Sequence, residues 1–231
     1  MQTAVNPRFF FCFDFAQDGR GGYTRYMLGG LSITYILVLV GCLLVSMTVH
    51  EFMHAYIGHR LGDTTAQEEG RLSLNPLAHI DPVMTILLPA VTLLLFHAPI
   101  LAAKPVPFTP WRVRYQEKGV ALLALAGPVS NLVLASVAAL AAHSLNQNSF
   151  IFQILSVFVS LNIGLFVFNL VPIPPLDGSR VLYAFLPEPA RNVMDQIEPY
   201  GFFIVFGLVL VGGFGGVLVG LNNFFLNLLG M

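Results

Sequence analysis

Long runs of apolar residues alternate with short polar connectors along most of the chain. One run extends from Leu28 to about Tyr56 and contains no charged residue before Glu51, and two others cover about 119–143 and 150–172. About 20 consecutive apolar residues suffice to cross a bilayer as a helix, and a spanning segment must be a helix or a closed barrel because lipid cannot satisfy its backbone. The pattern predicts transmembrane helices at these three places.

Two further apolar stretches are less regular. Residues 83–103 contain Pro89 and Pro99, and each proline interrupts helical hydrogen bonding. Residues 200–229 are rich in glycine. We expect 83–103 to be a broken segment or a re-entrant loop. The predicted fold class is an all-α polytopic membrane protein, a helix bundle with a re-entrant or broken hydrophobic segment.

The N-terminal region differs from the rest of the chain. Residues 1–27 mix charged and aromatic side chains and are expected to form an extramembrane arm, which leaves 28–231 as a single membrane-embedded domain. No basic segment followed by an apolar core and a cleavage site occurs near Met1, so no removable signal peptide is expected.

Composition agrees with a membrane location. Hydrophobic residues make up 56% of the chain and charged residues only 10%, whereas soluble domains carry about 25% charged residues. The formal net charge of −1 gives no support for a nucleic-acid partner. The only cysteines, Cys12 and Cys42, are too few and too far apart for a disulfide framework or a Cys-based zinc site.

The sequence His50-Glu51-Phe52-Met53-His54 is the first candidate chemical site. Residues four apart on a helix share one face, so the two imidazoles can bind one ion. This spacing suits Zn²⁺, and the intervening Glu51 can act as general base on a water molecule. A chance pentapeptide is the alternative. Ionisable groups within an apolar span are costly and are usually functional, which favours the metal site.

A catalytic zinc ion needs a third protein ligand, and Asp177 is the strongest candidate. It follows the third predicted span and the helix-breaking residues Pro172, Pro174 and Pro175, which leave Asn169 free of a continuing helix. A broken helix at membrane depth is tolerated where it is buried in protein or lines a wet cavity. The alternative is that Asp177 is an ordinary turn residue. The downstream carboxylates fit less well; these are Glu117, Glu188 and Glu198.

Four motifs occur together in a characteristic order: HEFMH, GRLSLNPLAHIDP (70–82), GPVSN (127–131) and NLVPIPPLDG (169–178). Together they resemble the site-2 protease family of intramembrane zinc metalloproteases, in particular its compact bacterial subgroup without a PDZ domain. The resemblance covers about residues 30–185.

The resemblance implies specific roles. One Zn²⁺ ion would be held by His50, His54 and Asp177, with Glu51 as the catalytic base, and Asn169 would help to hold the substrate or the developing oxyanion. The implied partners are membrane protein or peptide substrates and the lipid bilayer. The substrate, regulators and oligomeric state do not follow from the sequence.

Zinc ligands from two helices must lie at one depth, since each contacts the ion at about 2.0–2.2 Å. If 83–103 crossed the membrane, the spans 28–56 and 150–172 would run in opposite directions and take His50 and Asp177 towards opposite faces. A re-entrant 83–103 makes the two spans parallel.

Charge then orients the protein, because basic residues favour the cytoplasmic side. With a re-entrant segment, the side of the zinc site holds Arg60, Arg71, Lys104, Arg112, Arg114, Lys118, Arg180 and Arg191, and the other side holds only Arg8, Arg20 and Arg25. We therefore expect a multi-pass protein of the bacterial inner membrane whose active site faces the cytoplasm.

Two other functions use the same ligands: a zinc or other cation transporter, and a proteolytically inactive relative. No internal repeat of the kind common in transporters is visible, and the intact Glu51 argues against an inactive relative. Among supporting residues, Gly127 and Asn131 suit either helix packing or substrate contact. His79 and Asp81 are candidates to orient a zinc-bound histidine, with turn capping as the alternative.

Overall fold

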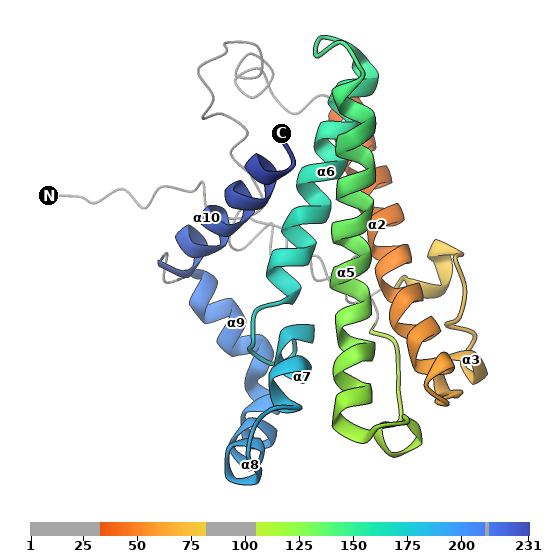
Figure 1. Cartoon of the computed structure of the whole chain (residues 1–231), viewed down its shortest axis with the longest axis vertical. Helices are drawn as coiled ribbons and strands as arrows, with labels where there is room; N and C mark the ends of the chain where they lie inside the picture. The colour runs from red at the N-terminus through yellow and green to blue at the C-terminus, as the bar shows by residue number, and fades with distance from the viewer. Residues whose placement is uncertain (1–32, 82–104, 211–212) are drawn as a thin grey trace, which may run out of the picture.

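The computed structural model describes residues 33–81, 105–210 and 213–231 (Figure 1). The expected arm at 1–27 and the expected re-entrant segment at 83–103 lie outside these residues. Every regular element within the described ranges is a helix, which confirms the all-α fold class.

Among the described residues, three helices are long and apolar enough to cross a membrane: α2 (Ile33–Arg60), α5 (Gln116–His143) and α6 (Phe150–Asn169). A helix of 28 residues, such as α2 or α5, measures about 42 Å, longer than the roughly 30 Å of a bilayer core. The three predicted spans are therefore present. The first helix continues to Arg60, four residues beyond its expected end, and it contains both histidines. The chain turns at Gly62, where φ is 102°.

α5 packs against both α2 and α6, which also contact each other (Figure 1). Its contact with α6 is a buried cluster that includes Ala135, Ala139, Val159 and Ile163. Alanine at these positions lets two helix backbones approach closely, which is how membrane helices associate without a hydrophobic driving force.

The direction of the helices follows from the contacts between them. His54 of α2 meets Leu123 of α5, and His50 meets Asn131 further along α5, so these two helices are antiparallel. α6 returns beside α5, so α2 and α6 run in the same direction (Figure 1). The two spans that bear the motifs are thus parallel, as expected.

The remaining described elements are shorter. The connector after α2 contains α3 (Thr65–Glu68) and the 3₁₀ helix η1 (Pro76–His79), and η3 (Pro110–Arg112) precedes α5. After α6 come α7 (Asp177–Tyr183), α8 (Glu188–Ile197), η4 (Glu198–Tyr200), α9 (Gly201–Leu210) and α10 (Gly213–Leu228). α10 packs back on α6, where the rings of Phe166 and Phe225 meet edge to face at 5.1 Å.

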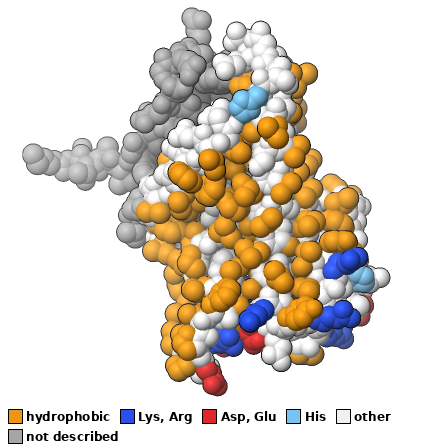
Figure 2. Space-filling model, viewed as in Figure 1, with side chains coloured by type: hydrophobic (Ala, Val, Ile, Leu, Met, Phe, Trp, Pro, Cys, Tyr) orange, Lys and Arg blue, Asp and Glu red, His pale blue; other side chains and the backbone are white. Residues whose placement is uncertain are grey.

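The surface is divided along the long axis of the molecule. In the face shown in Figure 2, hydrophobic side chains cover the sides of the bundle, and the charged side chains gather at its lower end. The hairpin that joins α5 to α6 at the other end, residues 144–149, contains no charged residue. An apolar belt with its charges at one end is the surface expected of a protein that crosses a bilayer.

Candidate metal centre

The structure brings His50, His54 and Asp177 together. The two histidines lie one turn apart on α2, with their Nε2 atoms 3.0 Å from each other. The Oδ2 atom of Asp177, at the start of α7, lies 3.2 Å from Nε2 of His50 and 3.3 Å from Nε2 of His54. The three residues form a group able to hold a metal ion.

The position of Asp177 depends on the chain break after α6. The prolines that follow Leu170 prevent the helix from continuing, and the chain folds back tightly before α7 begins. Gly178 makes this return possible, since a Cβ there would lie 2.2 Å from the carbonyl oxygen of Leu170 and 2.6 Å from that of Val171. A residue 127 positions after His50 therefore arrives beside it.

The second ring nitrogen of each histidine has a partner on α5. Nδ1 of His54 lies 2.8 Å from the carbonyl oxygen of Leu123, which can only accept, so this nitrogen carries the proton. Nδ1 of His50 lies 2.6 Å from Oδ1 of Asn131. Metal-binding histidines typically donate their other N–H in this way, which fixes the ring and its tautomer. Both Nε2 atoms thus present lone pairs to Asp177.

The two Nε2 atoms and Oδ2 of Asp177 each direct a lone pair towards the others, and such a group suits a cation. Oδ2 of Asp177 is buried and has no hydrogen-bond partner. For zinc bonds of about 2.0–2.1 Å, ligand atoms in a tetrahedral site are about 3.3–3.4 Å apart, close to the 3.0, 3.2 and 3.3 Å observed. Binding a metal ion requires the carboxyl group of Asp177 to be deprotonated.

Gly127 of α5 lies directly against the candidate ligands. A Cβ at this position would be 2.3 Å from Nε2 of His54 and 2.6 Å from Nε2 of His50. A side chain here would occupy the space beside the lone pairs, so only glycine leaves that space open. Sequence patterns left helix packing and substrate contact as alternatives for Gly127; the structure instead places its backbone beside the metal-binding nitrogens.

Glu51 is buried, and its carboxylate accepts a hydrogen bond from the backbone of a distant segment. Its Oε2 atom lies 3.2 Å from the amide nitrogen of Val106. Val106 stands between Pro105 and Pro107, so it provides the only N–H of these three residues. The structure therefore adds an orienting contact for Glu51 that no local sequence pattern indicates.

The segment that reaches Glu51 is tied to the end of α2. Asp63, which is 2% exposed, accepts hydrogen bonds from the amides of Thr65 (3.0 Å) and Thr109 (2.7 Å) and from the Thr65 hydroxyl (2.6 Å). The Arg114 amide donates to the carbonyl of Leu61 at 2.8 Å. Asp63 is thus an anchor that holds residues 105–109 beside Glu51.

Other predicted residues have different surroundings. Asn169 is the last residue of α6, and its side-chain amide donates to the Leu165 carbonyl at 2.9 Å, so its role in catalysis stays a prediction. The Nδ1 atoms of His50 and His54 have partners on α5, so His79 does not orient either ring through that atom. His79 instead bonds the carbonyl of Ser73 within its own connector.

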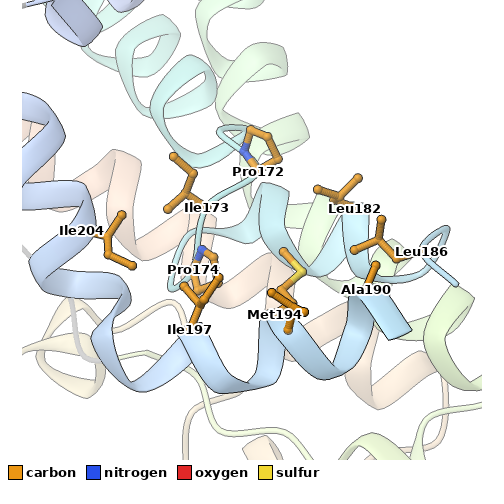
Figure 3. A pocket seen from close by; sticks show the side chains of 10 residues that line it. Pro172, Ile173, Pro174, Leu182, Leu186, Ala190, Met194, Ile197 and Ile204 are labelled. Atoms are coloured by element: carbon orange, nitrogen blue, oxygen red, sulfur yellow. The ribbon is translucent and has the colours of Figure 1, made fainter. Parts of the chain in front are cut away.

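An apolar cavity of about 330 Å³ lies away from these ligands (Figure 3). It is bounded by the chain that follows α6 and by α7, α8 and α9, and residues such as Ile173, Leu186 and Met194 line it. None of its lining residues is a candidate ligand or Glu51. The cavity is therefore separate from the metal centre.

A bundle of membrane-length helices around a His–His–Asp centre with an adjacent glutamate is the arrangement expected of a zinc hydrolase within a membrane. Residues 143–212 match the model described as Peptidase family M50. "Putative zinc metalloprotease YwhC" of Bacillus subtilis is 38% identical over 204 residues, which are 83% of this chain and 87% of that protein. "Putative zinc metalloprotease Rip2" of Mycolicibacterium smegmatis is 32% identical over 178 residues, 76% of this chain and 67% of that protein. No solved structure matches the chain at a significant level.

The chain belongs to peptidase family M50, the site-2 protease family. The family resemblance, the zinc cofactor and the integral membrane character predicted from the sequence are thereby confirmed. At this level the protein is a zinc metalloprotease of the membrane.

Proposed function

We propose that the protein is an endopeptidase that hydrolyses peptide bonds of transmembrane or membrane-associated proteins at, or just inside, the cytoplasmic surface of the bilayer. The observation that supports this most strongly is the group of His50, His54 and Asp177 with Glu51 beside it on α2. Binding a metal ion does not itself require a glutamate. The burial of Glu51 next to the ligands therefore favours a hydrolytic role.

The side chains divide the work of the reaction. The ligand group would hold Zn²⁺ through both Nε2 atoms and Oδ2 of Asp177, and zinc, when bound, supplies a Lewis acid that makes water nucleophilic near neutral pH. Glu51 would remove a proton from the attacking water and return it to the leaving amine. The Val106 amide keeps the carboxylate of Glu51 in place for this transfer. Asn169 would hold the substrate or stabilise the developing oxyanion.

The substrate must present an unwound stretch, because a transmembrane helix hides its carbonyls in hydrogen bonds. An exposed edge strand or loop near the site could hold such a stretch extended by β-addition. The connector after α2 is a possible source, and its described part contains α3, η1 and loop residues.

The orientation rests on charge. α2 and α6 run in parallel, and every lysine and arginine within the described ranges lies in a connector or helix at the motif-bearing end of the bundle: Arg60, Arg71, Arg112, Arg114, Lys118, Arg180 and Arg191. The uncharged hairpin lies at the opposite end. Since basic residues favour the cytoplasmic side, this supports an active site facing the cytoplasm, in a bacterial inner membrane.

The Glu51→Gln variant tests the function. In detergent or proteoliposomes with a membrane-anchored test substrate, it should keep zinc bound and lose cleavage by at least about 100-fold, the lower range of what a general base contributes. Phe52→Leu, a neighbouring change that removes no ionisable group, is the matched control. Full activity of Glu51→Gln would refute its role as base, and zinc flux without proteolysis would favour a transporter. Substrates trapped by the inactive variant can be identified by mass spectrometry.

A further inference from the structure

A line of buried polar side chains leads away from the metal centre into the bundle. Asn131 of α5, which bonds His50, also donates from Nδ2 to Oδ1 of Asn162 on α6 at 2.8 Å. Asn162 in turn donates from Nδ2 to Oγ of Ser46 on α2, also at 2.8 Å. All three of these side chains are fully buried, at 0% exposed. The line connects the three long helices.

Two backbone carbonyls at the end of this line away from His50 fix the direction of every hydrogen bond in it. The Ser46 hydroxyl donates to the carbonyl of Cys42 at 2.8 Å, and Nδ2 of Asn162 also donates to the carbonyl of Phe158 at 2.8 Å. Carbonyl oxygens cannot donate. Asn162 must therefore turn its nitrogen towards Phe158 and Ser46, and its oxygen towards Asn131.

The orientation of Asn162 then determines that of Asn131. Because Asn131 meets an oxygen at Asn162, it must present its nitrogen there and its own oxygen to His50. The carbonyl of Ser46, 3.4 Å from Nδ2 of Asn131, favours the same orientation. If both amides were reversed, the oxygen of Asn162 would face the Phe158 carbonyl, and two acceptors would be left together in the membrane interior.

We propose that Asn162 is a positioning residue for the metal: through Asn131 it fixes the proton of His50 on Nδ1 and so keeps the Nε2 lone pair available to zinc. A reversed Asn131 would offer an N–H to His50, which would then need its lone pair on Nδ1 and its proton on Nε2. That tautomer cannot bind a metal through Nε2. Asn162 touches neither the metal ligands nor a substrate, and the proposal concerns the zinc centre itself, whatever the substrate.

The experiment measures zinc affinity by chelator competition in the purified, detergent-solubilised full chain. Asn162→Leu, which keeps the approximate volume but removes the acceptor, should weaken zinc binding by about tenfold or more, as loss of partners of metal-binding histidines typically does. Ser46→Ala is the matched control. The Phe158 carbonyl still orients Asn162 in that variant, so its affinity should stay within about threefold of the parent protein.

A double-mutant cycle separates positioning from a general packing effect. If Asn162 acts through Asn131, adding Asn162→Leu to Asn131→Leu should weaken zinc binding no further, because coupled residues are not additive. Thermal unfolding of the zinc-free proteins reports the packing cost separately. If Asn162→Leu does not fold, Asn162→Ala serves instead, since it removes the acceptor for Asn131 without adding volume.

Three results would overturn the proposal: a zinc affinity of the Asn162 variant within threefold of the parent protein, additive losses in the cycle, or a Ser46→Ala loss as large as that of Asn162→Leu. Because zinc is measured directly, these results are independent of proteolysis. A protein with the expected zinc behaviour and no peptidase activity would refute the proposed function alone.

Discussion

Replacing Gly127 with alanine is the sharpest single perturbation of the metal centre. The added Cβ would lie 2.3 Å from Nε2 of His54, about 1.1 Å closer than the 3.4 Å at which ordinary contact begins. The rings of His50 and His54 are both held by hydrogen bonds to α5, so neither ring can move away without losing its partner. Metal sites tolerate changes of about 0.2 Å in ligand distance, so the methyl group and a correctly ligated ion cannot coexist.

We expect zinc affinity to fall at least about 100-fold, which corresponds to about 2.8 kcal/mol. Stability should change less, because a helical Gly→Ala change gains up to about 1 kcal/mol while overpacking costs about 1–3 kcal/mol. Competition with a fluorescent zinc chelator measures the first quantity, and thermal unfolding of the zinc-free protein the second.

The control is Gly41→Ala, the same change on α2 at a position where a Cβ would meet no atom within 4 Å. Gly41→Ala should bind zinc like the parent protein. Zinc binding by Gly127→Ala within threefold of the parent affinity would refute the close approach of α5 to the ligand nitrogens. It would also refute the claim that residue 127 must be glycine to leave space beside them.

Three further predictions address other parts of the site. Asp177→Asn should lower zinc affinity by at least about tenfold and abolish cleavage, and unchanged zinc binding would exclude Asp177 as a ligand. Asp63→Ala leaves the amides of Thr65 and Thr109 without their acceptor and should cost about 2–4 kcal/mol in denaturant unfolding, whereas Glu68→Ala, on the exposed surface, should change little; equal effects would contradict the anchoring role. Asn169→Ala should reduce kcat while zinc affinity stays constant, and a loss of zinc instead would make the residue structural.

Much of the site could be predicted from the sequence, because the patterns that indicate it lie within short stretches of the chain. A spacing of four residues places His50 and His54 on one helix face wherever that helix lies. Hydrophobic runs of sufficient length identify the three long helices without knowledge of their neighbours. Asp177 could be selected because ionisable groups beside broken membrane helices are uncommon and tend to be functional.

The contacts that orient Glu51 and His50 could not be predicted from the sequence, because they join residues far apart in the chain. Asn162 is one of several polar residues in an apolar run and matches no motif, and its contacts depend on α2 and α5 meeting α6 at that depth. The contact of Val106 with Glu51 spans 55 positions. Nothing in the residues around Val106 or Asn162 specifies these tertiary contacts.

Of the two alternatives for His79, a local contact within its own connector is the one observed, because its ring bonds the Ser73 carbonyl. Residue type made His79 and Asp81 reasonable partners for a zinc-binding histidine. The partners in the structure are an amide oxygen of Asn131 and the backbone carbonyl of Leu123. Every residue has a carbonyl, so the choice of Leu123 depends only on the register between the two helices.

The metal centre requires two imidazoles of α2 and the carboxylate at the start of α7 to hold one zinc ion. A crystal structure of the zinc-loaded protein, with anomalous data collected at the zinc edge, would locate that ion. We expect one strong peak per chain at about 2.0–2.2 Å from Nε2 of His50, Nε2 of His54 and a carboxylate oxygen of Asp177. A peak elsewhere, or an Asp177 carboxylate beyond about 3 Å from the ion, would contradict it.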